Sequence, residues 1–258
     1  MRAHYFAMFA MATVAALAKP AGANLVFSDN FSSYTNGNLV GQGPWVQLTA
    51  GTQPVQVSGG AASIAGPASG QYAEAPLGVT INTGSVFYGM DVSLASVNTT
   101  STAYFTSLGS GGSSFQDRVY AQQSGSGYVL GIGVVSQGAV YGTTALNFNQ
   151  DYRVVTEFDY IGNDDETAEL FVDPVDSTNP ANDTPYIESA DTVGNAGNSA
   201  YFDIRQATSG PTGTIDNVDV ATDFASAVAA APVPEPVGAM GLVFLAIGSM
   251  RRFRGAAR

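Results

Sequence analysis

Residues 152–172 read YRVVTEFDYIGNDDETAELFV, and this stretch decides the fold class of the chain. In its first half, every second side chain is β-branched or aromatic, and these side chains are Val154, Thr156, Phe158 and Tyr160. Side chains alternate between the two faces of a strand, so the pattern predicts a strand with one buried face. The polar residues 162–165 predict a turn, after which Thr167–Val172 returns with the same alternation. We therefore expect an antiparallel hairpin of an all-β fold.

Short segments of the same kind recur about every ten residues, and turns rich in Gly, Ser and Pro separate them. The further expected strands are 25–27, 46–48, 55–57, 63–65, 85–92, 103–108, 118–122, 128–135, 139–141, 200–206 and 214–221. The alternation in the last of these is imperfect and indicates a bulge. Residues 173–198 are expected to form a polar loop. About a dozen strands in roughly 200 residues predict a jelly-roll sandwich of two antiparallel sheets.

The N-terminus has the pattern of a secretory signal. A basic start at Arg2 is followed by an apolar, alanine-rich run at 5–18, and then by small residues at Ala21 and Ala23 that suit signal peptidase. We expect residues 1–23 to be a signal helix that is removed by cleavage after Ala23.

The last 27 residues combine a proline motif, an apolar run and a basic end. The motif consists of Pro234, Glu235 and Pro236, the uncharged run is Val237–Met250, and the basic end contains Arg251, Arg252 and Arg254. Both prolines favour an extended backbone around the glutamate, which suits a processing site. As a helix, the apolar run would span about 21 Å, less than the roughly 30 Å of a hydrocarbon core. The arginines predict a cytoplasmic end.

This order resembles the PEP-CTERM sorting tail, which bacteria pair with a membrane-embedded exosortase. The resemblance implies export, an inner-membrane intermediate held by the C-terminal hydrophobic helix, and transfer to the cell surface or the extracellular matrix. An exosortase-type enzyme is the implied processing partner. The alternative is an ordinary C-terminal core helix, but such a helix normally has a polar face and this run has none.

Between residues 24 and 231 the chain is strongly acidic. This part holds 20 of the 21 acidic residues and three arginines, which gives a formal net charge of −17. Nucleic-acid binding is excluded because no basic patch can neutralise phosphates. The charge favours solubility, cation binding or neutral partners such as uncharged glycans. Without histidine or cysteine in this part, only carboxylate chemistry is left for an enzyme, and glycoside hydrolysis is the reaction of that kind.

A second resemblance starts at Asp29. The residues that carry it are Asp29, Asn30, Phe31, Tyr34, Gly37, Leu39, Gly41, Gln42 and Trp45. They resemble the opening of LamG-like domains of the concanavalin-A-like superfamily, and the hairpin and the segment 215–218 fit the same pattern. The resemblance implies a fold and no activity. It covers most of residues 24–224 in outline, which we assign to the sandwich. The alanine-rich residues 225–231 are assigned to a linker or short helix, and 232–258 to the PEP-CTERM-like sorting tail.

Glu157 and Asp159 are the candidate catalytic pair. They share one face of a strand, about 6.5–7 Å apart. Concanavalin-A-like glucanases of the laminarinase type use a Glu-x-Asp-x-x-Glu strand, but Gly162 stands where the second glutamate would come. The simpler interpretation is a solvated strand face with Arg153 as an ion-pair partner. We therefore expect no catalytic residue.

Calcium is the second candidate chemistry, because concanavalin-A-like domains often hold a structural Ca²⁺ and acids gather in one loop region. The candidate ligands are Asp164, Asp165, Glu166 and Asp173. Ca²⁺ needs six to eight oxygen ligands, and no EF-hand spacing is present. No other cofactor is expected.

The aromatic residues indicate no glycan site by themselves. Trp45 follows Gly43-Pro44 and is expected to be buried under the first loop. Half-buried tyrosines in strands are ordinary, and the ones expected here are Tyr72, Tyr104, Tyr120, Tyr128 and Tyr141. The sequence therefore predicts a non-enzymatic, exported surface or matrix protein, which an exopolysaccharide could partner. The alternatives are a glycoside hydrolase and a protein-binding adhesin.

Overall fold

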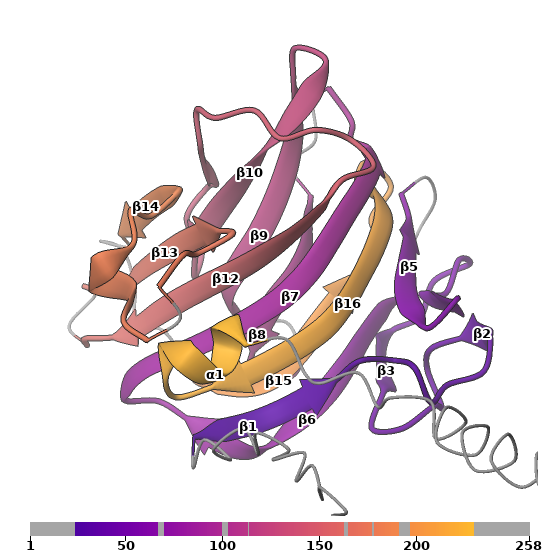
Figure 1. The fold of residues 1–258 in the computed structure, drawn as a ribbon. Coiled ribbons are helices and arrows are strands. Elements are labelled where there is room, and N and C mark those ends of the chain that lie inside the picture. Colours follow the sequence, from indigo (N-terminus) through magenta and orange to yellow (C-terminus); the bar gives the residue numbers. More distant parts are fainter. Residues whose placement is uncertain are drawn as a thin grey trace, which may run out of the picture.

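The computed structural model describes residues 24–66, 70–99, 103–112, 114–162, 165–176, 178–190 and 197–229. The chain folds into two antiparallel sheets that pack face to face as a jelly-roll sandwich (Figure 1), so the predicted fold class is confirmed. The expected signal helix and the expected hydrophobic tail helix lie outside the described residues. Within the described ranges, no helix is long and apolar enough to cross a membrane.

The first sheet, called sheet A, has nine strands in the described part of the chain. In spatial order they are β14 (Ile187–Ala190), β13 (Thr167–Val172), β12 (Asp151–Tyr160), β7 (Gly84–Ser96), β16 (Thr212–Ala221), β5 (Ala61–Ala65), β4 (Gln56–Ser58) and β2 (Gly37–Asn38), and β1 (Leu25–Asp29) pairs with β16. A short 3₁₀ helix, η1 (Pro180–Asn182), precedes β14, and helix α1 (Phe224–Val228) follows β16.

The second sheet, sheet B, has seven strands among the residues that the structure describes. In spatial order they are β11 (Val140–Tyr141), β10 (Gly127–Val134), β9 (Phe115–Ser124), β8 (Tyr104–Gly109), β15 (Ser199–Arg205), β6 (Tyr72–Ile81) and β3 (Val46–Thr49). The core lies between the two sheets, where alternate side chains of both are fully buried. Each sheet therefore has a second, outward face on which the intervening residues lie.

The predicted hairpin is present as β12 and β13, with Val154 opposite Val172 and Thr156 opposite Leu170. Val154 and Phe158 are buried in the core. The predicted bulge is also present, since the register of β16 against β7 shifts between Asp216 and Asp219.

Three strands, β2, β6 and β14, were given no bounds from the sequence, although Tyr72 at the start of β6 was expected to lie in a strand. β6 contains Pro76 and Gly78, which normally argue against a strand. Its neighbour β3 pairs only with residues 72–74 of β6. Beyond residue 74, this side of β6 is therefore a sheet edge, where the lack of an amide hydrogen at Pro76 costs no inter-strand hydrogen bond. β14 lies inside the expected polar loop 173–198 and pairs with β13 at the edge of sheet A.

The opening motif forms a buried corner around Asp29. One carboxylate oxygen of Asp29 accepts hydrogen bonds from the Tyr34 hydroxyl at 2.6 Å and from Trp45 Nε1 at 2.7 Å. The other accepts from the Phe31 amide at 2.8 Å. Trp45 is 1% exposed and stacks on Phe31, so the expectation that it is a core residue is confirmed. The contacts of Asp29 therefore give the opening motif a role in stabilising the fold.

Helix α1 packs on the outward face of sheet A (Figure 1). Phe224 of this helix contacts Phe87 of β7 and Phe171 of β13 edge to face. Gly89 allows the close approach, since a Cβ there would lie 1.9 Å from the Ala227 carbonyl oxygen. Residues 225–231, which were expected to be a linker or a short helix, therefore begin within helix α1, which packs on the sheet.

Arg153 fastens the same helix to the sheet. Its guanidinium group donates to Asp91 at 3.2 Å, to Asp219 at 3.0 Å and to the backbone carbonyl of Ala227. It also donates to the Asn217 carbonyl at 2.6 Å. The expected pairing of Arg153 with Glu157 or Asp159 is therefore wrong, because the carboxylates of two neighbouring strands and α1 lie closer to it.

Candidate functional site

The candidate pair Glu157 and Asp159 lies on the outward face of sheet A. Glu157 stands directly opposite Glu169 of β13, and Asp159 accepts hydrogen bonds from Ser85 and Thr167. Burial raises the pKa of Glu157 to about 7, and the nearby charges of Asp159 and Glu169 add to the shift. Neither residue lines any of the pockets described below.

The calcium candidates are not brought together by the described residues. Asp164 lies outside them, Asp165 is exposed, and Glu166 is 2% exposed. Asp173 uses one carboxylate oxygen to accept from the Arg153 amide at 2.8 Å. The described part of the chain contains no group of three or more His, Cys, Asp or Glu side chains placed to hold a metal ion.

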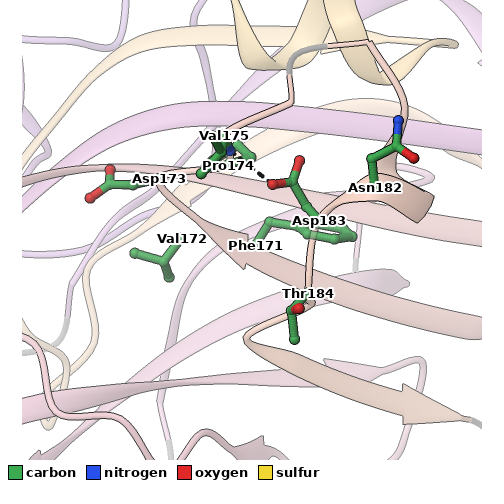
Figure 2. Close-up of a pocket in the computed structure, with 8 residues that line it drawn as sticks. All are labelled: Phe171, Val172, Asp173, Pro174, Val175, Asn182, Asp183 and Thr184. Atoms are coloured by element: carbon green, nitrogen blue, oxygen red, sulfur yellow. Dashed lines mark hydrogen bonds between the residues drawn. The ribbon is translucent and has the colours of Figure 1, made fainter.

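A pocket of about 370 Å³ lies beside Asp173, between the end of β13 and the loop before β14 (Figure 2). Asp183 also lines it, but its carboxylate accepts from the amides of Val175 at 2.9 Å and Asp176 at 3.1 Å. Figure 2 shows the Asp173 carboxylate pointing away from that of Asp183. These acids shape the loop, and calcium binding stays a prediction.

The predicted processing residues cannot be placed. Ala21 and Ala23 of the signal lie outside the described residues, as do Pro234, Glu235, Pro236, Arg251, Arg252 and Arg254 of the tail. Cleavage and sorting therefore stay predictions.

The outward face of sheet B carries a cluster that the sequence analysis did not assemble. We call it the tyrosine–arginine surface, and its residues are Tyr72 of β6, Tyr104 of β8, Phe115, Arg118 and Tyr120 of β9, and Arg205 of β15. Strand alternation places Arg118, Tyr120 and Arg205 there, because Val119, Ala121 and Ile204 beside them point into the core, and Phe115 joins them beyond an irregularity in the pairing of β8 with β9.

The rings and the guanidinium groups of this surface are in mutual contact. The Arg205 guanidinium carbon lies 4.2 Å from the ring centroid of Tyr104 and 4.8 Å from that of Tyr72. Arg118 lies 5.8 and 5.7 Å from the ring centroids of Tyr104 and Tyr120. Tyr104 and Tyr120 are buried beneath, while Tyr72, Phe115 and both arginines are half-buried. The cluster thus has a buried layer of two tyrosine rings, covered by a partly exposed layer of aromatic rings and guanidinium groups.

Arg118 lines two pockets on this face. The first, of about 270 Å³, is lined by Ser114, Phe115, Arg118, Val135 and Ser136. The second, of about 310 Å³, is lined by Arg118, Tyr120, the loop residues 136–139 and Tyr141. The Tyr141 ring lies over Gly131 of β10, where a Cβ would come within 2.7 Å of it. Arg118 holds the loop by donating to the Gln137 carbonyl at 2.6 Å.

Two acids belong to the same face of sheet B. Asp203 of β15 stands between Glu74 of β6 and Ser107 of β8 and is 2% exposed. Burial raises the pKa of Asp203 to about 8, helped by the charge of Glu74, and the Ser107 hydroxyl lowers it less. Burial also raises the pKa of Glu74. At neutral pH, Asp203 is therefore mostly protonated and does not cancel the arginine charges.

Sequence reasoning identified the tyrosines but treated them as ordinary strand residues. The structure places Tyr72, Tyr104, Tyr120 and Tyr141 on the outward side of sheet B, while Tyr128 is buried in the core. One signal was visible in the sequence. Arg118 and Tyr120 are two residues apart in an expected strand, so they had to share a face, and arginine is rare in this chain.

No family model matches the chain, and no curated protein matches it. Similar solved structures include domain 4 of a GH43 extracellular arabinanase from Geobacillus stearothermophilus in complex with arabinotriose (TM-score 0.45, 14% identity, 79% of this chain and 96% of that chain). Others are an endo-β-1,4-glucuronan lyase from the fungus Trichoderma reesei (0.46, 11%, 79% and 98%) and the peanut lectin with a nine-residue peptide (0.41, 13%, 76% and 96%). These folds are of the jelly-roll, concanavalin-A-like type found in carbohydrate-binding proteins and lectins. The likeness is one of architecture, and no activity is carried over from it.

Proposed function

We propose that this protein is a non-enzymatic, glycan-binding component of the cell surface or extracellular matrix, and that it binds through the tyrosine–arginine surface. The observation that carries the proposal is the gathering of three tyrosines, one phenylalanine and two arginines from four strands on one partly open face. Aromatic rings offer a broad apolar face, and the polar edges of tyrosine and arginine offer hydrogen bonds beside it. A sugar ring, which has apolar C–H faces and a hydroxyl rim, is complementary to such a surface.

The export part of the proposal rests on the two terminal patterns of the sequence. A signal at residues 1–23 and a PEP-CTERM-like tail at 232–258 would deliver the sandwich to the outside, where exopolysaccharide is available. An exosortase-type enzyme would process the tail.

A glycan array with the purified protein tests the binding, and Tyr72→Ala is the informative variant because Tyr72 is half-buried and belongs to the surface. We expect at least one glycan to be retained by the wild type and lost by Tyr72→Ala. Tyr186→Ala is the matched control, since Tyr186 is a half-buried tyrosine that follows η1 and donates to the Thr144 carbonyl. Equal retention by wild type and Tyr72→Ala on every glycan, or no retention at all, would contradict the proposal.

Glycoside hydrolysis is the second candidate, and the observation that favours it is the raised pKa of Glu157 beside Glu169. A carboxyl group with a pKa near 7 is suited to general acid catalysis. Release of reducing sugar from a broad panel of polysaccharides, lost in Glu157→Gln, would support hydrolysis. The absence of turnover by the wild type across that panel would remove it.

A further inference from the structure

We infer that the glycan bound by the tyrosine–arginine surface is acidic, and that Arg118 and Arg205 hold its carboxylate groups. This inference rests on the proposed function and narrows it to a ligand class. It also runs against the expectation from composition, because a net charge of −17 between residues 24 and 231 favours neutral or cationic partners.

The distribution of positive charge is the first argument. Only three arginines and no lysine or histidine lie between residues 24 and 231, and two of the three are on this surface. In so acidic a chain, an arginine easily finds a carboxylate. Both ion pairs among the described residues nevertheless belong to the third arginine, Arg153. Arg118 and Arg205 instead lie against tyrosine rings.

The hydrogen-bonding capacity of the two groups is the second argument. A guanidinium group has five N–H donors in a planar fork that matches a carboxylate. The described residues provide one acceptor to Arg118, the Gln137 carbonyl, and none to Arg205. The Nε atoms of both side chains are buried without a hydrogen-bond partner in this part of the chain. The Nε atom of the ion-paired Arg153 is buried without such a partner as well, so the difference lies in the outer N–H donors of Arg118 and Arg205, to which an anion at the surface would supply acceptors.

The spacing of the two charges is the third argument. Arg205 and Arg118 lie 4.2 and 5.8 Å from the centroid of the same Tyr104 ring, so two like charges share one aromatic platform. Such an arrangement is unfavourable in the free protein unless an anion comes between or beside the charges. The two strand acids on this face, Asp203 and Glu74, are 2% and 9% exposed, and neither forms an ion pair with Arg118 or Arg205 among the described residues.

The fit to a glycan follows from what surrounds the arginines. Arg118 lines pockets of about 270 and 310 Å³, and each also contains an aromatic ring, Phe115 in one and Tyr120 in the other. A chain of acidic sugars presents a carboxylate and an apolar ring face on every unit. Such a chain could place a sugar ring on an aromatic side chain and its carboxylate on the neighbouring guanidinium group, in successive pockets.

Calorimetric titration of the purified protein with matched polymers tests the inference. The probes are polyglucuronate, polygalacturonate and polymannuronate, each compared with its carboxyl-reduced form, which keeps the linkages and loses the charge. We expect at least one acidic polymer to bind about tenfold more tightly than its reduced form. Arg205→Gln should lower the affinity for the acidic polymer about tenfold and leave that for the reduced polymer unchanged. Arg205→Lys, which keeps the charge without the fork, should fall between the two.

Gln150→Glu is the control for net charge, since it lowers the net charge by one unit, as Arg205→Gln does, at an exposed position outside this surface. It should bind like the wild type, and unchanged thermal unfolding of Arg205→Gln verifies that the variant is folded. Equal affinity for acidic and reduced polymers would overturn the inference and leave glycan binding intact. Binding of dextran sulfate in the absence of any polyuronate binding would overturn the assignment to carboxylates. Failure of every polymer, acidic and reduced, would overturn the proposed function itself.

Discussion

Asp117 provides the sharpest test of the energetics of this fold. It lies on β9 with its side chain in the core, is 0% exposed, and neither carboxylate oxygen has a hydrogen-bond partner of good geometry among the described residues. Burial raises the pKa of Asp117 to about 7 from an ordinary value of 3.8, and the Thr156 hydroxyl and the Arg118 charge lower it by less. The folded protein therefore holds this proton more tightly than the unfolded chain does.

The consequence is a stability that falls as the pH rises. Between the unfolded pKa of 3.8 and the folded pKa of about 7, the folded state binds more protons, so the free energy of unfolding is highest below this window and is lost through it. At 1.36 kcal/mol for each pKa unit, the loss from Asp117 amounts to about 4 kcal/mol. This is a large fraction of the roughly 5–15 kcal/mol that stabilises a typical domain.

Asp117→Asn removes the titration while keeping the shape of the side chain. We expect the variant and the wild type to have nearly the same free energy of unfolding at pH 4, where the wild-type carboxyl is mostly protonated in the folded state. At pH 8 the variant should be more stable by a few kcal/mol. Its free energy of unfolding should still decline with pH to a smaller extent, because Asp203, with a pKa of about 8, titrates in both proteins.

Urea denaturation from pH 4 to pH 8.5, followed by the fluorescence of Trp45, measures this difference. Trp45 is the single tryptophan of the chain and is 1% exposed, so its emission reports unfolding. Asp165→Asn, at an exposed position, is the control and should track the wild type. If Asp117→Asn and the wild type have the same pH dependence, Asp117 is ionised in the folded protein and the reasoning from burial is wrong.

Four further outcomes are expected. Arg153→Met should lower the free energy of unfolding by about 3–5 kcal/mol, because it removes the cation that pairs with Asp91 and with the 1% exposed side chain of Asp219, and an unchanged urea midpoint would contradict this. Binding of an acidic polymer should weaken from pH 7 to pH 9 as Asp203 ionises on the same face of sheet B as the arginines, so a flat pH profile would exclude an effect of Asp203 on binding. Removing calcium with EDTA should lower the melting temperature if the acidic loop holds the ion, whereas equal melting with EDTA and with Ca²⁺ would argue against it. Alanines at positions 234–236 should retain the protein in the inner membrane, and unaltered release would disprove the sorting assignment.

The fold could be predicted from the sequence because its signals are local. The hairpin of β12 and β13 follows from a period of two, and the Asp29 corner follows from a motif within seventeen residues. β6 escaped prediction because Pro76 is tolerable only where a neighbouring strand ends, and that depends on the pairing of β3, not on β6 itself.

The candidate site could not be predicted in the same way, because its members come from strands far apart in the sequence. Arg205 meets Tyr72 because β15 pairs with β6, and it meets Tyr104 because β15 also pairs with β8. The spacing of these residues in the sequence does not show which strands pair with one another. The catalytic interpretation of Glu157 rested on a local pattern, the spacing of Glu157 and Asp159 in one strand. That pattern did not show that Glu169 of the neighbouring strand stands opposite Glu157.

The two outward faces of the sandwich differ in a way that bears on the proposed function. On the outward face of sheet A, helix α1 covers the apolar residues Phe87, Val155 and Phe171. Arg153 binds the helix to the strands, so the contacts on this face stabilise the fold. The last described residue, Ala229, directly follows this helix, and the carbonyl of the first described residue, Asn24, accepts a hydrogen bond from the Thr222 amide. Figure 1 shows the strands of sheet B behind those of sheet A. The tyrosine–arginine surface is on the outward face of sheet B, so the core separates it from α1. A sandwich held by residues that follow Ala229 would thus keep its proposed glycan-binding face on the side opposite its attachment.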